Sequence, residues 1–333
     1  MYNMTKHNEK SEISKLDLTD KKILCELDLN CRESISKIAH KLRVGRNVVS
    51  YRIKNLESQN IIKSYVCSIN LGLLGYKTYK VFFKFNNQDK ENDFVKEVLD
   101  NPNIIHCLRT SGSFDYTISI AVKTIIELDE IISGLKTKFN DLIKDYFISI
   151  VVYSKIFKYQ KILLHQKEDQ EIKINKYTSE GKSIDIDDID KKILKTLSQE
   201  ANISIVALSI KTKQSLDIVK YRLKKLQKEL IISNRAIFDM SKLGYYHYVI
   251  LMKTKNLSKT EENKLVSWCT YKNNVMFCSK RIGNYDFEIN AAITSLEDLN
   301  SFITDLKEDF SGIIDSYEII LNHDLIKLNY IPF

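Results

Sequence analysis

One face of a predicted helix beginning near Arg46 groups amide, hydroxyl and guanidinium side chains. Val49, Ile53 and Leu56 lie at i, i+4 and i+7, so they should face the interior and the polar residues between them should face outward. Such a helix can read base edges in the DNA major groove while flanking cations contact phosphates. The predicted DNA contacts are Lys41, Arg43, Arg46, Asn47, Ser50, Tyr51, Arg52 and Lys54. The alternative is a basic face that is only solvated.

The same pattern returns 170 residues later. Residues 20–62 align with residues 190–232 without a gap, and 16 of the 43 positions are identical. In the second copy Leu216 replaces Arg46 and Asp217 replaces Asn47. The carboxylate of Asp217 would repel phosphate, unless it accepts a hydrogen bond from the amino group of a cytosine. The predicted contacts of this copy are Lys211, Lys213, Lys220, Tyr221, Arg222 and Lys224. This unit either binds DNA less specifically or mainly positions the first.

Three short helices are expected over residues 20–60, as in a helix-turn-helix unit. After Asn60 the residues become β-branched and aromatic, in the order strand, helix, strand, strand, helix, strand. These patterns predict an α+β fold, a tandem duplication of a winged-type helix-turn-helix domain followed by a ferredoxin-like βαββαβ domain. The expected divisions are a polar tail (1–16), helix-turn-helix domain 1 (17–68), ferredoxin-like domain 1 (69–158), a linker (159–184), helix-turn-helix domain 2 (185–238) and ferredoxin-like domain 2 (239–333).

Composition limits the classes of function. Apolar residues make up 44% of the chain and charged residues 28%, which is ordinary for a globular protein. No apolar run reaches the roughly 18–20 residues of a membrane span, and the polar start does not resemble a signal peptide, so a cytoplasmic protein without a membrane partner is expected. The six cysteines lack zinc-ligand spacing, and neither a metal nor a cofactor is predicted. A formal net charge of +8 permits nucleic-acid binding without requiring it.

Several motifs together resemble the Lrp/AsnC (feast/famine) family of transcriptional regulators. They lie at residues 18–24, 49–57, 61–63 and 112–115, and the resemblance covers nearly the whole chain twice. It implies a sequence-specific DNA-binding regulator, activator or repressor, whose ferredoxin-like (RAM-type) domains bind an effector such as an amino acid and self-associate. Family members usually carry one copy per chain. The two copies here therefore pair either with each other or with those of another chain.

In that family a glycine-to-aspartate turn lies near the effector pocket. The matching effector-binding residues here are Gly112, Ser113, Asp115, Gly283, Asn284 and Asp286. Glycine permits a tight turn whose amides can hold a carboxylate, and an aspartate can accept a hydrogen bond from an ammonium group. The alternative is a plain hairpin turn.

Two other functions are open. Siroheme decarboxylases resemble the same two-domain layout, and His106 and Arg109 lie on a strand where such an enzyme could use them. The second half has Phe277 and Lys280 there, however, and no two of the six histidines have a relay spacing. The second alternative is a partner protein that pairs with single-copy relatives without binding DNA. We predict a non-enzymatic DNA-binding regulator; the sequence does not specify its operator or the sign of regulation.

Overall fold

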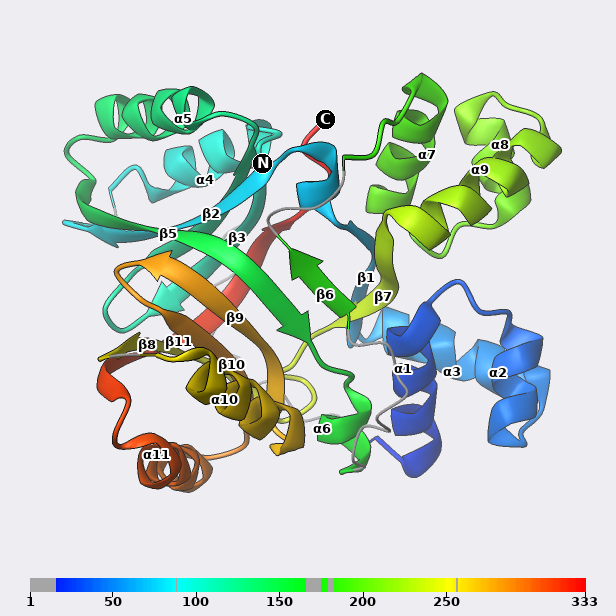
Figure 1. Cartoon of the computed structure of the whole chain (residues 1–333). Helices are drawn as coiled ribbons and strands as arrows, with labels where there is room; N and C mark the ends of the chain where they lie inside the picture. Colours follow the sequence, from blue (N-terminus) through cyan, green and yellow to red (C-terminus); the bar gives the residue numbers. More distant parts are fainter. Residues whose placement is uncertain (1–15, 88, 166–174, 179–182, 256) are drawn as a thin grey trace.

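The computed structural model describes residues 16–87, 89–165, 175–178, 183–255 and 257–333. Figure 1 shows two groups of helices on one side of the molecule and helix-covered sheets on the other. The first group is α1 (Leu18–Asn30), α2 (Ile35–Leu42) and α3 (Arg46–Ser58), and the second is α7 (Asp188–Gln199), α8 (Ile205–Thr212) and α9 (Leu216–Glu229). The two predicted helix-turn-helix units are therefore present.

Local sequence determines where these helices begin and turn. Asp17 caps α1 by accepting a hydrogen bond from the amide three residues on, in a reciprocal capping box. Ser34 and Ser204 cap α2 and α8 through the same kind of bond. Each of these second helices ends on a left-handed residue, Arg43 at φ 56° and Lys213 at φ 54°. The turn that presents the third helix thus follows the same course in both units.

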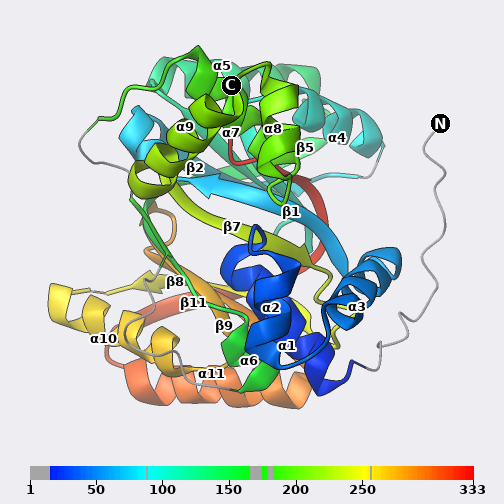
Figure 2. The same ribbon diagram turned by 90° about the vertical axis from the view of Figure 1, so that its right-hand side faces the viewer.

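An antiparallel ribbon joins the two halves of the chain. It consists of β1 (Ile62–Ile69) and β7 (Ile231–Phe238), and Figure 2 shows it between the helical units. Each unit packs on the strand of the other half: Ile23 of α1 shares a buried cluster with Phe238 of β7, and Leu194 of α7 lies in a cluster with apolar side chains of β1. The two units are therefore held together by a shared core.

A buried ion pair strengthens this crossed packing. Asp28 of α1 accepts a hydrogen bond from Arg235 Nε of β7 at 2.7 Å, and its second oxygen accepts one from the Tyr159 backbone N–H at 2.8 Å. Arg235 also donates to the Phe157 carbonyl at 3.3 Å. Asp28 is fully buried and Arg235 is 9% exposed. Loss of either partner would leave the other charge buried and unpaired, so the pair fixes α1 on β7.

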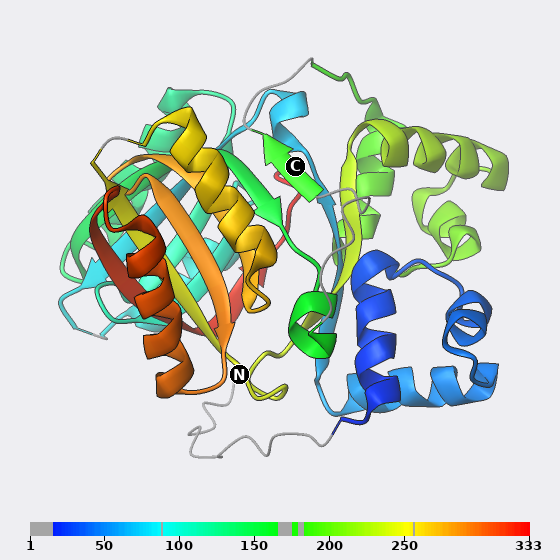
Figure 3. The same ribbon diagram turned by 60° about the horizontal axis from the view of Figure 1, so that its bottom comes forward.

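Each half continues in the predicted order β-α-β-β-α-β. A 3-10 helix, η1 (Leu71–Leu74), leads into β2 (Lys77–Phe85), α4 (Glu91–Asp100), β3 (Ile104–Ser111), β4 (Tyr116–Val122), α5 (Ile125–Lys138) and β5 (Ile143–Ile156). The second set is β8 (Tyr246–Thr254), α10 (Lys259–Tyr271), β9 (Val275–Gly283), β10 (Phe287–Ile293), α11 (Leu296–Phe310) and β11 (Ile314–Leu328). The helices cover the outer faces of the sheets, where Phe94 and Phe302 lie in separate cores; Figure 3 shows α10 and α11 over the second sheet.

The two sheets close into one antiparallel barrel. The strand order is β2-β4-β3-β11-β8-β10-β9-β5, and β5 pairs back with β2. The pairs β3–β11 and β5–β9 are the seams between the halves. The sequence had left open whether the copies pair within one chain; the structure pairs them within it. Because strand side chains alternate, every second residue points into the barrel.

The segment predicted to be a linker is part of the fold. It contains α6 (Gln160–Leu164) and β6 (Asn175–Thr178), and β6 pairs with the end of β5. Ile162 and Leu163 are buried, because this lysine-rich stretch carries an apolar run that α6 folds against the body. The parts of the predicted linker and tail that lie outside the described residues are 166–174, 179–182 and 1–15.

The described residues have three further features. In the described ranges no helix combines the length and apolar character that a bilayer crossing requires. In the same ranges no three His, Cys, Asp or Glu side chains gather as metal ligands do. All six cysteines are buried free thiols.

Candidate nucleic-acid interface and buried polar cluster

The outward face of α3 is open to solvent. The predicted DNA contacts on it that are exposed or half-buried are Arg46, Asn47, Ser50, Tyr51 and Lys54. Beneath them Val49 and Leu56 are buried in the core of the unit. The helix therefore has the inward and outward sides that the spacing predicted.

Two arginines predicted to contact phosphates also brace the helices. Arg52 Nη1 lies 2.7 Å from carboxylate oxygens of both Asp17 and Asp20 at the start of α1. Hydrogen bonds to Asp20 and Asp17 raise the pKa of Arg52. Arg222 makes the equivalent contacts with the two aspartates at the start of α7, at 2.7 and 3.2 Å. A phosphate would have to compete with these carboxylates for either guanidinium.

The remaining cations differ in how far they are engaged. Lys41 lies 2.6 Å from Glu26, and Lys211 lies 2.6 Å from Glu200. The predicted contacts without an ion-pair partner within 4.0 Å among the described residues are Arg43, Arg46, Lys54, Lys213 and Lys224. These five are free to neutralise phosphates.

The second unit presents a different surface. Asp217 is exposed at the start of α9, with Lys220 3.9 Å away. On α8, Val206 is 54% exposed and Ile210 is 71% exposed, where the first unit has a serine and a histidine. The predicted contacts exposed on this unit are Lys211, Lys213, Lys220, Tyr221 and Lys224. The two recognition surfaces are thus alike in backbone and unlike in chemistry.

The glycine turns lie at the seams of the barrel. Gly112 has φ 113°, and a Cβ there would lie 2.9 Å from the Ile319 carbonyl oxygen. Gly283 has φ 131°, and a Cβ would lie 2.6 Å from the Ile148 carbonyl oxygen. Only glycine fits this close approach of one half to the other. Both positions therefore have a structural role of their own.

The aspartates of these turns are bound to neighbouring strands. Asp115 accepts a hydrogen bond from the Phe85 backbone N–H at 2.8 Å, and Lys84 lies 3.7 Å away. Asp286 accepts from the backbone N–H and the hydroxyl of Thr254, at 2.8 and 3.0 Å. The structure thus brings the predicted effector residues to the seams and engages their carboxylates. The other two residues of this set, Ser113 and Asn284, are exposed.

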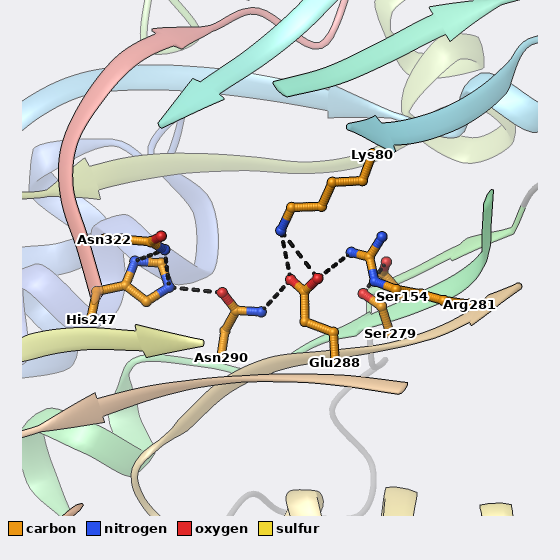
Figure 4. Close-up of polar contacts among 8 residues, drawn as sticks. All are labelled: Lys80, Ser154, His247, Ser279, Arg281, Glu288, Asn290 and Asn322. Carbon is orange, nitrogen blue, oxygen red and sulfur yellow. Dashed lines mark hydrogen bonds and ion pairs between the residues drawn. The ribbon is translucent and has the colours of Figure 1, made fainter. Parts of the chain in front are cut away.

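A polar cluster fills one part of the barrel interior (Figure 4). Lys80 Nζ donates to both oxygens of Glu288, at 2.9 and 3.1 Å, and Arg281 Nη2 lies 2.5 Å from the same carboxylate. Asn290 Nδ2 donates to Glu288 at 2.7 Å, and its oxygen lies 2.8 Å from Nε2 of His247. Lys80 comes from the first half and the others from the second. The cluster therefore ties the two sheets together.

Burial and charge shift the protonation of these groups. Burial alone would raise the pKa of Glu288, but Arg281 and Lys80 lower it to about 2. Burial lowers the pKa of Lys80. Burial also lowers the pKa of His106 to about 3, with the Lys80 cation adding to the effect, and that of His247 to about 4. Both imidazoles are therefore neutral at pH 7.

The sequence analysis missed this cluster. One available signal was the alternation of Glu288 and Asn290 with apolar residues in β10, which is polar on the inward side. The spacing of histidines along the sequence could not show that His247 lies near His106. The two residues belong to different halves of the chain, and the closure of the barrel brings them together. Arg109 faces the opposite way, 3.1 Å from Glu91 beneath α4.

Comparisons with known families agree with this architecture. A model described as winged helix-turn-helix DNA-binding matches residues 16–63 and 186–232. A model described as the Lrp/AsnC ligand binding domain matches residues 80–160. These matches cover both helix-turn-helix units and the first ferredoxin-like domain.

Individual proteins of known sequence or structure also resemble this chain. The proline dehydrogenase transcriptional activator of Rhodobacter capsulatus is 29% identical over 119 residues, which is 35% of this chain and 77% of that protein. The glutamate uptake regulatory protein of Zymomonas mobilis is 28% identical over 131 residues, or 38% of this chain and 79% of that protein. A solved siroheme decarboxylase, NirDL, matches 95% of this chain and 94% of its own, with a TM-score of 0.61 and 14% identity. That last likeness shows a shared fold.

Proposed function

Because this chain belongs to the Lrp/AsnC family of regulators, we propose that it binds DNA as one chain with two unlike reading heads. The observation that carries the proposal is the crossed packing on the β1–β7 ribbon. It holds two exposed third helices on the same side of the molecule (Figures 1 and 3). Single-copy relatives need two chains for such a pair; here the covalent link supplies it.

The first unit reads bases in this proposal. Arg46 and Asn47 lie at the exposed start of α3, where a recognition helix contacts base edges, and Arg matches guanine while Asn matches adenine. Arg43 and Lys54 contact phosphates. Arg52 holds the helix in place through the α1 aspartates rather than touching DNA, which modifies its predicted role.

The second unit contributes mainly phosphate contacts. Lys213, Lys220 and Lys224 are exposed around α9, and Asp217 repels phosphate unless it accepts a hydrogen bond from a base amino group such as that of cytosine. The operator should therefore have two unequal half-sites. Their centres should lie one helical turn apart, about 34–36 Å, or a multiple of that.

A gel-shift series tests this proposal. Full-length protein should bind its selected DNA with an affinity that falls steeply with salt, by about 0.9 log units per log unit of salt for each neutralised phosphate. The double variant Arg46→Ala/Asn47→Ala should lose about 1–3 kcal/mol per lost base contact on specific DNA and little on random DNA. Lys96→Ala, an exposed change on α4, is the matched control. Absence of any shift at low salt would overturn the proposal, and equal losses on both DNAs would remove base reading from α3.

An effector is the second part of the proposed function. The family model that matches residues 80–160 is a ligand-binding domain, and the glycine turns place Ser113 and Asn284 at the surface of the seams. We propose that an amino-acid effector binds there and changes the affinity for DNA. Titration of the twenty amino acids into a gel shift tests this, and Ser113→Ala should weaken the response. An affinity unaffected by all twenty amino acids would count against it.

Two alternative functions are a partner of single-copy relatives and a decarboxylase-like enzyme. A partner that pairs with single-copy relatives would need open sheet edges, but β3–β11 and β5–β9 occupy the seam edges within the chain. A decarboxylase-like activity is favoured by one observation, the two neutral histidines beside Lys80 and Glu288 inside the barrel. Titration with siroheme tests it, because binding would shift the Soret band. An unchanged spectrum would exclude a tetrapyrrole substrate.

A further inference from the structure

One part of the barrel interior sets two cations against a single carboxylate. Lys80 and Arg281 both contact Glu288, so two cations share one carboxylate. Glu288 is fully buried, Arg281 is 3% exposed and Lys80 is 5% exposed. A buried cation without its own counter-ion is costly, since charges are removed from water only when paired. Within this cluster the cations therefore outnumber the carboxylates by one. A further carboxylate on the inward side, Glu318 of β11, lies opposite Leu251 of β8 and is hydrogen-bonded to Tyr285.

Unused hydrogen-bond donors lie at the same place. Arg281 directs one terminal nitrogen to Glu288, but its Nε and Nη1 have no partner among the described residues. The hydroxyl of Ser149, which is fully buried, also has none in that part of the chain. Buried donors are nearly always satisfied in native proteins, so these orphaned donors require a partner such as a bound ion, ligand or water.

The strand register places these donors together. Ser149 of β5 lies directly opposite Lys80 of β2. On its other side, Val151 of β5 pairs with Arg281 of β9, so Arg281 and Ser149 are diagonal neighbours about 7–8 Å apart, which is within reach of a long side chain. A buried hydroxyl thus stands between two cations. Eight-stranded barrels have an interior that side chains fill or that holds one small ligand.

We infer that the barrel holds a small carboxylate between Arg281 and Ser149. Its oxygens accept hydrogen bonds from Arg281 Nε and Nη1 and from the Ser149 hydroxyl, and its charge balances the second cation. This site goes beyond the proposed DNA-binding function, and it is distinct from the exposed residues of the glycine turns. Binding is measured without DNA, so either proposal can fail alone.

The site occurs once per chain. The glycine turns align Gly112 with Gly283, so at the same offset Thr110 and Thr117 occupy the positions of Arg281 and Glu288 in the first half. A pseudo-twofold partner site would therefore lack both charged groups. The ligand-binding family model likewise matches only the first ferredoxin-like domain, while the charged residues of the site come mainly from the second. A stoichiometry of one ligand per chain follows.

Thermal unfolding of the full-length protein in a carboxylate-free buffer tests the inference. Sodium acetate should raise the Tm by about 2 °C or more over sodium chloride at the same ionic strength, because a ligand that binds only the folded state stabilises it. Acetamide, which has the same shape and no charge, should not. Glycine and the other amino acids test whether a larger carboxylate is preferred. If acetate does no more than chloride and no amino acid exceeds it, the inference is wrong.

Two variants locate the site. Ser149→Ala removes one donor without touching the ion pairs. It should raise at least threefold the acetate concentration that gives half of the maximal increase in Tm. Arg281→Gln should abolish that effect; circular dichroism checks that the variant is folded. Thr110→Ala, at the pseudo-equivalent position, is the control and should respond as the parent does. A parent-like acetate response in the folded Ser149→Ala and Arg281→Gln variants would place the ligand elsewhere and overturn the assignment.

Discussion

Lowering the pH should weaken the fold through two histidines in the barrel. Burial lowers the pKa of His106 to about 3 and that of His247 to about 4, whereas an unfolded histidine has a pKa of about 6.5. Between these values the unfolded chain binds protons that the folded chain does not. The free energy of unfolding should therefore be highest above pH 6.5 and should fall as the pH drops below it.

The size of this effect follows from the same values. At pH 5.0 the pH is about 1.5 units below the pKa of an unfolded histidine. At about 1.36 kcal/mol per unit, each buried histidine then lowers the free energy of unfolding by about 2 kcal/mol. Both imidazoles keep some contact with solvent, and we expect this to halve the cost to about 1 kcal/mol each. The pair should then account for about 2 kcal/mol between pH 7.5 and 5.0. Glu288 does not contribute in this window, because the stability that its lowered pKa provides is lost only as the pH falls below about 4.3, the pKa of an unfolded glutamate.

Urea unfolding followed by circular dichroism at pH 7.5 and 5.0 measures this loss. The double variant His106→Asn/His247→Asn should lose about 2 kcal/mol less than the parent over that interval. His40→Gln, a change at an exposed position on α2, should lose as much as the parent. If the parent and the double variant lose the same free energy, the two imidazoles are not the proton-linked groups and the reasoning from their burial is refuted.

Two further changes test the joints of the fold. Gly283→Ala should destabilise the protein by about 1–3 kcal/mol, because its Cβ would meet a carbonyl oxygen at 2.6 Å and its φ is 131°. Gly312→Ala, where no atom lies within 4 Å of the added Cβ, is the matched control in a thermal melt. Equal melting points for the two variants would refute the close approach at Gly283. Asp28→Ala should cost about 3–5 kcal/mol in urea unfolding by leaving Arg235 buried and unpaired, and a loss below 1 kcal/mol would show that this pair does not lock the helical unit to the ribbon.

Much of the architecture follows from local patterns. The apolar spacing around Val49 and the second copy of the Asp20 motif predicted both helix-turn-helix units, and the change to β-branched residues after Asn60 predicted both ferredoxin-like domains. These features depend on periodicity and capping, which neighbouring residues determine. The inferred order of elements is therefore the part of the prediction that the fold confirms.

What sequence could not supply depends on contacts between the halves. The closure of the barrel brings Lys80 to Glu288, 208 positions further along the chain, and no local pattern records such a pairing. Arg52 was assigned to phosphate because its type suits that role, but its contacts depend on how α1 meets α3. The predicted linker concealed Ile162 because lysines surround it; its burial is decided by tertiary packing.

Selection of bound fragments from random DNA by the full-length protein tests the central claim most directly. The account predicts an enriched site with two unequal halves spaced by one helical turn, about 10–10.5 base pairs, or a multiple of it. Selection with the Arg46→Ala/Asn47→Ala variant should reduce the base preference in only one half of that site. A perfect palindrome, or no enrichment over the input library, would contradict the claim that one chain carries two unlike reading heads.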